Sequence, residues 1–214
     1  MKYHSYLFDF DGTLVDSMPS YIAAMLRILD ENNIKYQEDI IKTITPLGYL
    51  GTAVYYEKEL GLNMPAEKTV RLMKQYAYNE YAYNIQAKPN VIQVLTELKK
   101  QGADLHILTA SPHEVLDVCL NRLNMLDLFT NVWSCDDFGM GKADPEIYRA
   151  AAKRIGRPVG EILFLDDNYN ADKTALSAGM KVCGVYDTSS QDYRDEIKAI
   201  CDYYVTDFSE LLNI

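Results

Sequence analysis

The chain alternates short apolar runs with segments of helical periodicity. Four of the runs are hydrophobic enough for buried parallel strands, and they lie at 6–9, 105–109, 162–166 and 181–185. Weaker strand candidates lie at 132–133 and 203–205. Helical periods fill the second half of the chain at 91–101, 112–123, 145–155 and 171–178. This alternation predicts an α/β fold with a doubly wound, Rossmann-like parallel sheet.

One interval does not fit a simple alternation. About eighty residues separate the end of the first strand from Pro89, which is too long for one crossover helix. Helical patterns fill this stretch at 18–33, 38–44, 52–60 and 65–83. We therefore expect residues 17–88 to form an inserted all-helical cap, and residues 1–16 with 89–214 to form the α/β core domain.

Composition and charge narrow the possible partners. Apolar residues make up 48% of the 214 residues, which is enough for a sizeable core. The formal charge of -10 argues against binding nucleic acid or an anionic membrane through bulk electrostatics. No secretory signal or membrane-length apolar run is present, and the four cysteines form no CxxC pair. We expect reduced thiols, a cytoplasmic location and no nucleic-acid or membrane partner.

Polar residues follow the apolar runs, at the carboxyl ends of the predicted strands. Open parallel sheets bind ligands beyond the carboxyl ends of their strands. Four such ends or nearby loops carry reactive groups, in the segments 9–13, 109–111, 141–142 and 166–168. Acids from the first and last of these segments should therefore face the same crevice.

The residue types in these segments point to phosphoryl transfer. Clustered carboxylates must keep protons or recruit a cation, and oxygen ligands without His or Cys favour Mg²⁺ over zinc. Lys142 adds a fixed positive charge, and Thr109 adds a hydroxyl followed by the amides of a helix start. These elements together are typical of a phosphoryl-transfer site. The chain has no Walker loop and no GxGxxG motif, so a nucleotide-binding P-loop is not expected.

Four segments in this order closely resemble the motifs of one known family. They are DFDGTLVDS at 9–17, LT at 108–109, GKADP at 141–145 and FLDDN at 164–168. They resemble the haloacid dehalogenase superfamily of hydrolases, in particular its phosphatase branch with a helical cap, which includes phosphoglycolate phosphatases and beta-phosphoglucomutases. The resemblance spans about residues 5 to 186.

The resemblance implies a role for each acid of the first motif. Asp9 would be the nucleophile that takes the phosphoryl group as an aspartyl-phosphate. Asp11 would protonate the leaving oxygen and then activate the hydrolytic water. Relatives that cleave carbon–halogen or carbon–phosphorus bonds lack this second acid, so its presence favours cleavage or transfer of a phosphate ester.

The resemblance also implies the binding residues. Thr109 and Lys142 would act with the two acids in catalysis, and the phosphoryl oxygens would be held by Gly12, Thr109, the Ala110 N–H and Lys142. A Mg²⁺ ion would be held by the Asp9 carboxylate, the backbone carbonyl of Asp11 and Asp167.

Several neighbouring residues depart from the family pattern or invite another interpretation. A further metal-binding acid of many relatives is displaced by one position to Asp172, which we interpret as a helix first-turn residue. Whether Asp166 contacts the metal stays open. Ser111 is expected to N-cap the helix that begins at Pro112, and His106 is expected to pack in the core.

The sequence thus predicts a Mg²⁺-dependent phosphatase for a small phosphorylated metabolite, acting as a monomer or weak homodimer. A phosphomutase of the beta-phosphoglucomutase type is the alternative, because the motif residues do not separate the two reactions. A non-catalytic, receiver-like signalling domain is a remote alternative. Receiver domains carry their acidic pair first, whereas this chain carries it last.

Overall fold

The computed structural model describes residues 2–37 and 39–214. The chain divides into two compact units. One consists of Met1–Asp16 with Gln86–Ile214 and is called the core unit below, and the other is Ser17–Ile85 and is called the helical unit.

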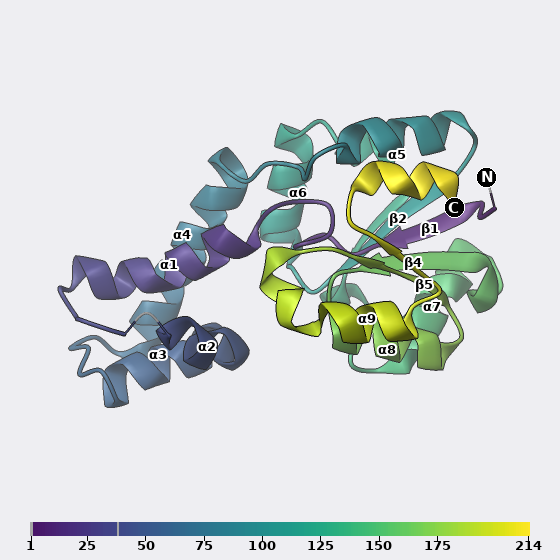
Figure 1. The fold of residues 1–214 in the computed structure, drawn as a ribbon. Coiled ribbons are helices and arrows are strands. Elements are labelled where there is room, and N and C mark those ends of the chain that lie inside the picture. The colour runs from purple at the N-terminus through teal and green to yellow at the C-terminus, as the bar shows by residue number, and fades with distance from the viewer. Residues whose placement is uncertain (1, 38) are drawn as a thin grey trace. The chain divides into compact units, whose positions relative to one another are not determined.

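The core unit is built on a six-stranded sheet in which every neighbouring pair is parallel (Figure 1). The strand order is β3-β2-β1-β4-β5-β6. The strands are β1 (Ser5–Phe8), β2 (Asp104–Thr109), β3 (Asn131–Ser134), β4 (Ile162–Asp166), β5 (Lys181–Val185) and β6 (Tyr203–Val205). All six lie where the apolar runs predict them, and the predicted doubly wound α/β fold is confirmed.

Helices cover both faces of this sheet. They are α5 (Val91–Lys100), α6 (His113–Arg122), α7 (Pro145–Ile155), α8 (Tyr169–Ala178) and α9 (Arg194–Ile200). Short 3₁₀ turns connect them, at η2 (Leu126–Leu128), η3 (Cys135–Phe138), η4 (Val159–Glu161), η5 (Thr188–Tyr193) and η6 (Phe208–Asn213). Figure 1 shows α5 beside η6 on one face and α7, α8 and α9 on the other. The sequence patterns do not predict α9 or the short turns.

The apolar core explains why the central strands read as continuous hydrophobic runs. All four residues of β1 and all five of β4 are buried, because helices cover both faces of these strands. On the face of α7 and α8, Tyr148 and Phe164 pack edge to face with ring centroids 5.1 Å apart. The helices thereby hold β4 in a fixed place beside β1.

The strand order reverses between β1 and β4. From β1 the chain adds β2 and β3 on one side, and it then returns to add β4, β5 and β6 on the other side, so we call the boundary between β1 and β4 the reversal point. These strands are in register, with Phe8 opposite Leu165, and the Asp9 N–H donates to the Leu165 carbonyl at 2.8 Å. The loops that follow β1 and β4 therefore begin side by side, at the position where doubly wound sheets bind their ligands.

The helical unit has its own hydrophobic core. Its elements are α1 (Met18–Glu31), α2 (Ile40–Ile44), η1 (Thr45–Leu47), α3 (Gly48–Lys58) and α4 (Ala66–Tyr83), and no strand occurs among its described residues. Tyr56 and Met73 are fully buried between α1, α3 and α4, and the Tyr56 hydroxyl donates to the Met25 carbonyl. The α3 helix begins four residues before the expected Thr52, at Gly48, which has a positive φ of 62°.

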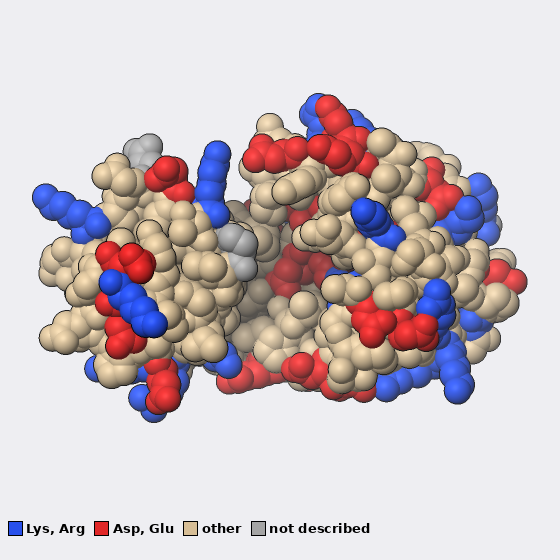
Figure 2. All heavy atoms as spheres, turned by 90° about the horizontal axis from the view of Figure 1, so that it is seen from below, with Lys and Arg blue, Asp and Glu red and all other residues tan. Residues whose placement is uncertain are grey.

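The net negative charge is not gathered into one patch on the face drawn in Figure 2, where acidic and basic side chains are interspersed over each unit. Within the described part of the chain, none of the helices combines the length and the apolar character needed to cross a membrane.

Candidate active site

Three acids meet where β1 and β4 end. Asp9 follows β1, and Asp166 and Asp167 end or follow β4. One carboxylate oxygen from each lies within 4.8 Å of the other two, and all three residues are buried. The structure thus brings together two of the residues predicted to hold a metal, Asp9 and Asp167, and adds Asp166. The contribution expected from Asp11 is its backbone carbonyl.

Lys142 lies against this acidic cluster. Its ammonium donates to Asp9 Oδ1 and, at 2.8 Å, to Asp166 Oδ2. The lysine sits in the loop before α7, and the buried Tyr148 hydroxyl donates to its carbonyl oxygen at 3.1 Å. The ammonium also lies 5.4 Å from the centre of the Phe164 ring. An aromatic residue of α7 therefore contacts the backbone of the lysine, and one of β4 contacts its ammonium.

The electrostatics of the cluster show an excess of negative charge. Burial raises the pKa of Asp9 to about 7; Lys142 opposes this shift, whereas Asp166 and Asp11 add to it. Burial and the charges of Asp166 and Asp9 also raise the pKa of Asp167 well above its ordinary value. Burial disfavours the charged form of Lys142, but Asp166 and Asp9 outweigh it and raise the lysine pKa. One ammonium does not compensate three buried carboxyl groups, and a further cation would stabilise their ionised forms.

The two consecutive acids have different surroundings. Asp166 Oδ2 accepts from Lys142, and Asp166 Oδ1 accepts from the Asn168 N–H at 2.8 Å. Among the described residues, Asp167 accepts one hydrogen bond, from the Thr13 hydroxyl, at the long distance of 3.4 Å. Asp166 is therefore committed to orienting the lysine and the loop, whereas Asp167 keeps lone pairs available to a cation.

Gly12 allows the loop after β1 to lie directly on Asp167. Its φ is 79°, and a Cβ at this position would lie 2.7 Å from Asp167 Oδ2. Because real Cβ atoms do not approach an oxygen so closely, only glycine fits here without a shift of the acid. The backbone at Gly12 thus forms one wall of the candidate cation site.

The loop after β2 supplies hydroxyl groups and corrects one sequence prediction. Ser111 does not cap the next helix, because α6 begins at His113 with Pro112 at its N-cap position. Instead, the Ser111 hydroxyl donates to Asp11 Oδ2 at 2.6 Å, and its N–H donates to the Thr109 hydroxyl oxygen at 3.0 Å. The Thr109 oxygen acts as an acceptor in that contact, so its own proton can be donated to an anion. Sequence reasoning missed the contact between Ser111 and Asp11.

Other residues singled out from the sequence lie outside the acidic cluster. Asp172 is fully buried in the first turn of α8, with Oδ2 accepting from the Cys201 thiol at 3.4 Å. His106 is fully buried in β2, as expected, and its Nδ1 accepts from Asn131 at 3.0 Å. All four cysteines are free thiols.

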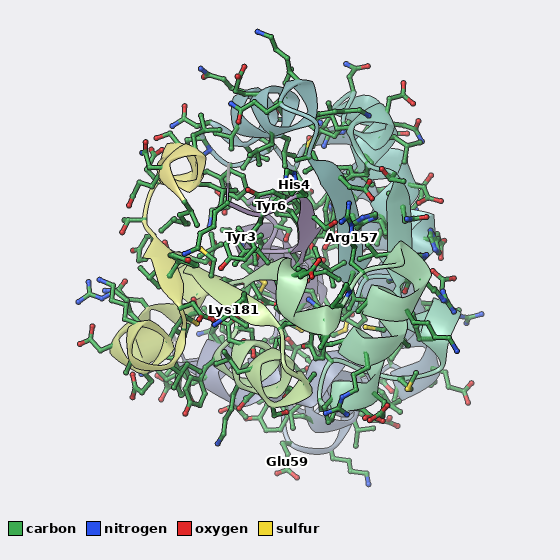
Figure 3. The ribbon with its side chains drawn as sticks, turned by 90° about the vertical axis from the view of Figure 1, so that its right-hand side faces the viewer. Tyr3, His4, Tyr6, Glu59, Arg157 and Lys181 are labelled. Atoms are coloured by element: carbon green, nitrogen blue, oxygen red, sulfur yellow. The ribbon has the colours of Figure 1, made fainter. Side chains whose placement is uncertain are left out.

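A separate cavity of about 340 Å³ lies at the opposite edge of the sheet, where β1 begins. Figure 3 looks onto this edge and labels Tyr3, His4 and Arg157, which line the cavity. Its lining contains the opposite charges of Arg157 and Glu161 but none of the acids that follow β1 and β4. The cavity is therefore distinct from the site at the carboxyl ends of the strands.

Comparison with known proteins agrees with this geometry. Pyrophosphatase PpaX of Bacillus velezensis is 32% identical over 182 residues, covering 84% of this chain and 81% of the relative. The crystal structure of a predicted phosphoglycolate phosphatase from Haemophilus somnus has a TM-score of 0.82 at 22% identity and covers 100% of this chain and 98% of that one. CbbY from Rhodobacter sphaeroides, in complex with xylulose 1,5-bisphosphate, has a TM-score of 0.79 at 19% identity, covering 98% and 96%. The two structures share the fold.

A family model described as haloacid dehalogenase-like hydrolase matches residues 3–179. The match begins just before β1 and ends just after α8, so it includes Asp9, Lys142 and both acids after β4. The chain is an enzyme that belongs to the haloacid dehalogenase-like hydrolases.

Proposed function

We propose that the chain is a Mg²⁺-dependent phosphatase that hydrolyses a small phosphorylated metabolite through an aspartyl-phosphate on Asp9. The observation that carries this proposal is the position of Lys142, whose ammonium joins the Asp9 carboxylate to Asp166 at the reversal point of the sheet. A lysine in this position can attract a phosphate to the nucleophile and balance charge as the phosphoryl group moves.

In the first step, a carboxylate oxygen of Asp9 attacks phosphorus, and the bond from phosphorus to the leaving oxygen breaks. Asp11 donates a proton to that oxygen, so the product leaves as a neutral alcohol. The Ser111 hydroxyl donates to Asp11 Oδ2 at 2.6 Å and supports this role by fixing the orientation of the Asp11 carboxyl group.

In the second step, Asp11 removes a proton from water, and the water oxygen attacks phosphorus. The bond between phosphorus and the Asp9 oxygen breaks, and inorganic phosphate leaves with the carboxylate restored. The Thr109 hydroxyl, the Ala110 N–H and the backbone at Gly12 would hold the phosphoryl oxygens in both steps. The surroundings of Thr109 support this assignment, because its proton is available for donation.

The donor set fits Mg²⁺. The cluster offers oxygen atoms only, and Asp167 has lone pairs available whereas both oxygens of Asp166 have partners. The ion would be held by the Asp9 carboxylate, the Asp11 carbonyl and Asp167. When bound, it would neutralise charge on the phosphoryl oxygens. We assign Asp166 to holding Lys142.

The likeness to pyrophosphatase PpaX supports testing inorganic pyrophosphate first. Cleavage of pyrophosphate uses the same two steps, with phosphate in place of the alcohol as the leaving group. Small phosphate esters, including phosphoglycolate and sugar phosphates, complete the substrate class.

Phosphate release from p-nitrophenyl phosphate, pyrophosphate and a panel of small phosphate esters tests the proposal, with Mg²⁺ or with EDTA. We expect turnover in Mg²⁺ only, and acid-quenched enzyme should carry base-labile phosphate on Asp9. Asp9→Asn should abolish both signals while keeping the fold, and Asp195→Asn, at an exposed acid of α9, should match the wild type. Absence of metal-dependent turnover on every substrate contradicts the proposal.

A second assay separates hydrolysis from the phosphomutase alternative. The enzyme is incubated with beta-glucose 1-phosphate and a trace of the bisphosphate, and both free phosphate and the isomeric sugar phosphate are measured. A phosphatase releases phosphate faster than it forms the isomer. Isomer formation in excess of phosphate release contradicts the phosphatase assignment.

A further inference from the structure

Lys88 lies in the segment through which the chain returns to the core unit. This segment pairs with the outgoing segment that follows Gly12: the Lys88 N–H donates to the Leu14 carbonyl at 2.9 Å, and the Asp16 N–H donates to the Gln86 carbonyl at 3.0 Å. The Lys88 backbone is therefore held beside the loop that carries Asp9 and Asp11.

The Lys88 ammonium has three acceptors for its three protons. It donates to the Gly12 carbonyl at 2.6 Å, to the Tyr186 carbonyl at 2.5 Å and to Asp187 Oδ2 at 3.0 Å. The side chains of Lys88 and Asp187 are only 16% and 7% exposed, so water screens the ion pair weakly. The lysine is thus fully coordinated, and it joins the loops that follow β1 and β5.

Asp187 is itself held rigidly. Its Oδ1 accepts from the Ser189 N–H at 2.9 Å and from the Ser189 hydroxyl at 2.6 Å, which caps η5, while Oδ2 accepts from Lys88. The acid therefore anchors the lysine to a part of the fold that follows the buried strand β5.

We propose that Lys88 is a positioning residue for phosphoryl transfer, which holds the Gly12 carbonyl and so fixes the turn that directly follows the nucleophile Asp9 and the acid Asp11. This inference rests on the proposed function. The turn also has backbone hydrogen bonds of its own, from the Gly12 N–H to the Val15 carbonyl at 3.0 Å and from the Leu14 and Val15 N–H groups to the Phe10 carbonyl at 2.9 and 3.1 Å, and Lys88 adds the link to the loop after β5.

The position of Gly12 also matters for the candidate cation site. The backbone of Gly12 lies directly against Asp167, where a Cβ would come within 2.7 Å of Oδ2. Without Lys88, the turn at Gly12 can move away from Asp167. The carboxyl groups of Asp11 and Asp167 would then leave their reactive positions. Small displacements of reacting groups lower catalytic rates by large factors.

The test compares Lys88→Met, which keeps the length and apolar stem, with Lys88→Arg, which keeps the charge and donors. Lys181→Met is the matched control: it also breaks a lysine–aspartate pair, with Asp202 at 2.7 Å, at the start of β5 and away from the site (Figure 3). We expect Lys88→Met to lower kcat about tenfold with a much smaller change in KM, because the ammonium holds the turn and not the substrate. Lys88→Arg should recover part of kcat, and the control should match the wild type.

Hydrogen–deuterium exchange gives a second readout that needs no turnover. In Lys88→Met, the amides of residues 12–15 should exchange at least several times faster, while those of β4 remain unchanged. If Lys88→Met folds poorly, Asp187→Asn serves in its place, because an amide oxygen can still cap η5 while the charge that holds Lys88 is lost. Asp187→Asn should also lower kcat and speed exchange of the amides of residues 12–15, but by smaller factors than Lys88→Met.

Unchanged exchange in residues 12–15, or a kcat equal to that of the control, overturns the role of Lys88. A wild-type enzyme without turnover contradicts the proposed function instead, and the exchange comparison still decides whether Lys88 holds the turn.

Discussion

Replacing Lys142 with methionine tests the electrostatic core of the site. The substitution removes the ammonium that contacts Asp9 and Asp166 but keeps an apolar side chain against the Phe164 ring. The side chains of the lysine and the two acids are 13%, 8% and 2% exposed, so water cannot easily replace the lost charge. Two buried carboxyl groups then face each other without their cation.

The loss of folding stability can be estimated from these contacts. Removing one member of a buried ion pair typically costs about 3–5 kcal/mol. Asp9 can relieve part of this cost by taking a proton, since its pKa is already raised to about 7 by burial. We therefore expect Lys142→Met to lower the free energy of unfolding by roughly 3 kcal/mol at pH 7 without metal, at the low end of that range. Turnover should fall at least on the order of 100-fold, as for loss of a group that stabilises developing charge.

Urea unfolding in EDTA, followed by the fluorescence of the single tryptophan, Trp133, measures the stability change. Lys153→Met, at an exposed position of α7, is the matched control and should stay within about 0.5 kcal/mol of the wild type. The double variant Lys142→Met with Asp166→Asn should regain about 1–2 kcal/mol over the single variant, because one unpaired charge is removed. A Lys142→Met protein as stable as the control, or a double variant with strictly additive losses, would refute the reasoning.

Three further changes test other parts of the site. Ser111→Ala removes the hydrogen bond to Asp11 and should lower kcat by about tenfold, the equivalent of one hydrogen bond to a charged group, while Ser111→Thr should retain most activity in the same phosphate-release assay. Gly12→Ala forces a Cβ to within 2.7 Å of the Asp167 carboxylate and should raise the Mg²⁺ concentration for half-maximal activity at least tenfold; an unchanged Mg²⁺ titration would contradict the close approach. Burial lowers the pKa of His106, so its contribution to stability is complete above the unfolded value of about 6.5 and declines as pH falls through that value, because only the unfolded chain then gains the proton. Urea unfolding at pH 7.5 and 5.5 should show that His106→Gln loses less stability on acidification than the wild type, and equal losses would contradict the assignment.

Much of the fold could be predicted because buried parallel strands have a clear signature. In β1 every residue after Ser5 is apolar, in β4 every residue before the terminal Asp166 is apolar, and the helices between strands carry apolar stripes. The exception is α9, Arg194–Ile200, where only Ile197 is buried and the pattern is too short to indicate a helix. Its position depends on packing against α8 and β6, which local periodicity does not express.

The gathering of Asp9, Asp166 and Asp167 could also be predicted, since parallel strands bring their carboxyl ends to one edge of the sheet. The role of Ser111 could not. The segment Ser111–Pro112–His113–Glu114 contains the usual signals of a helix start at Pro112. The helix begins one residue later, and this small difference turns the Ser111 side chain toward Asp11 and away from the helix amides.

The different roles of Asp166 and Asp167 could not be predicted from the sequence either, because they depend on how the chain turns after β4. Consecutive residues of an extended strand point to opposite faces, but both of these acids reach the site, because the strand ends at Asp166 and the chain turns there into the cap of α8. The Asn168 N–H binds Asp166 Oδ1 across this turn, which directs Oδ2 to Lys142. Asp167 then lies against Gly12 and accepts a long hydrogen bond of 3.4 Å from the Thr13 hydroxyl. One acid therefore secures the lysine and the other remains available to a cation, so Asp167→Asn should raise the Mg²⁺ concentration for half-maximal activity more than Asp166→Asn does, whereas Asp166→Asn should mainly weaken the hold on Lys142.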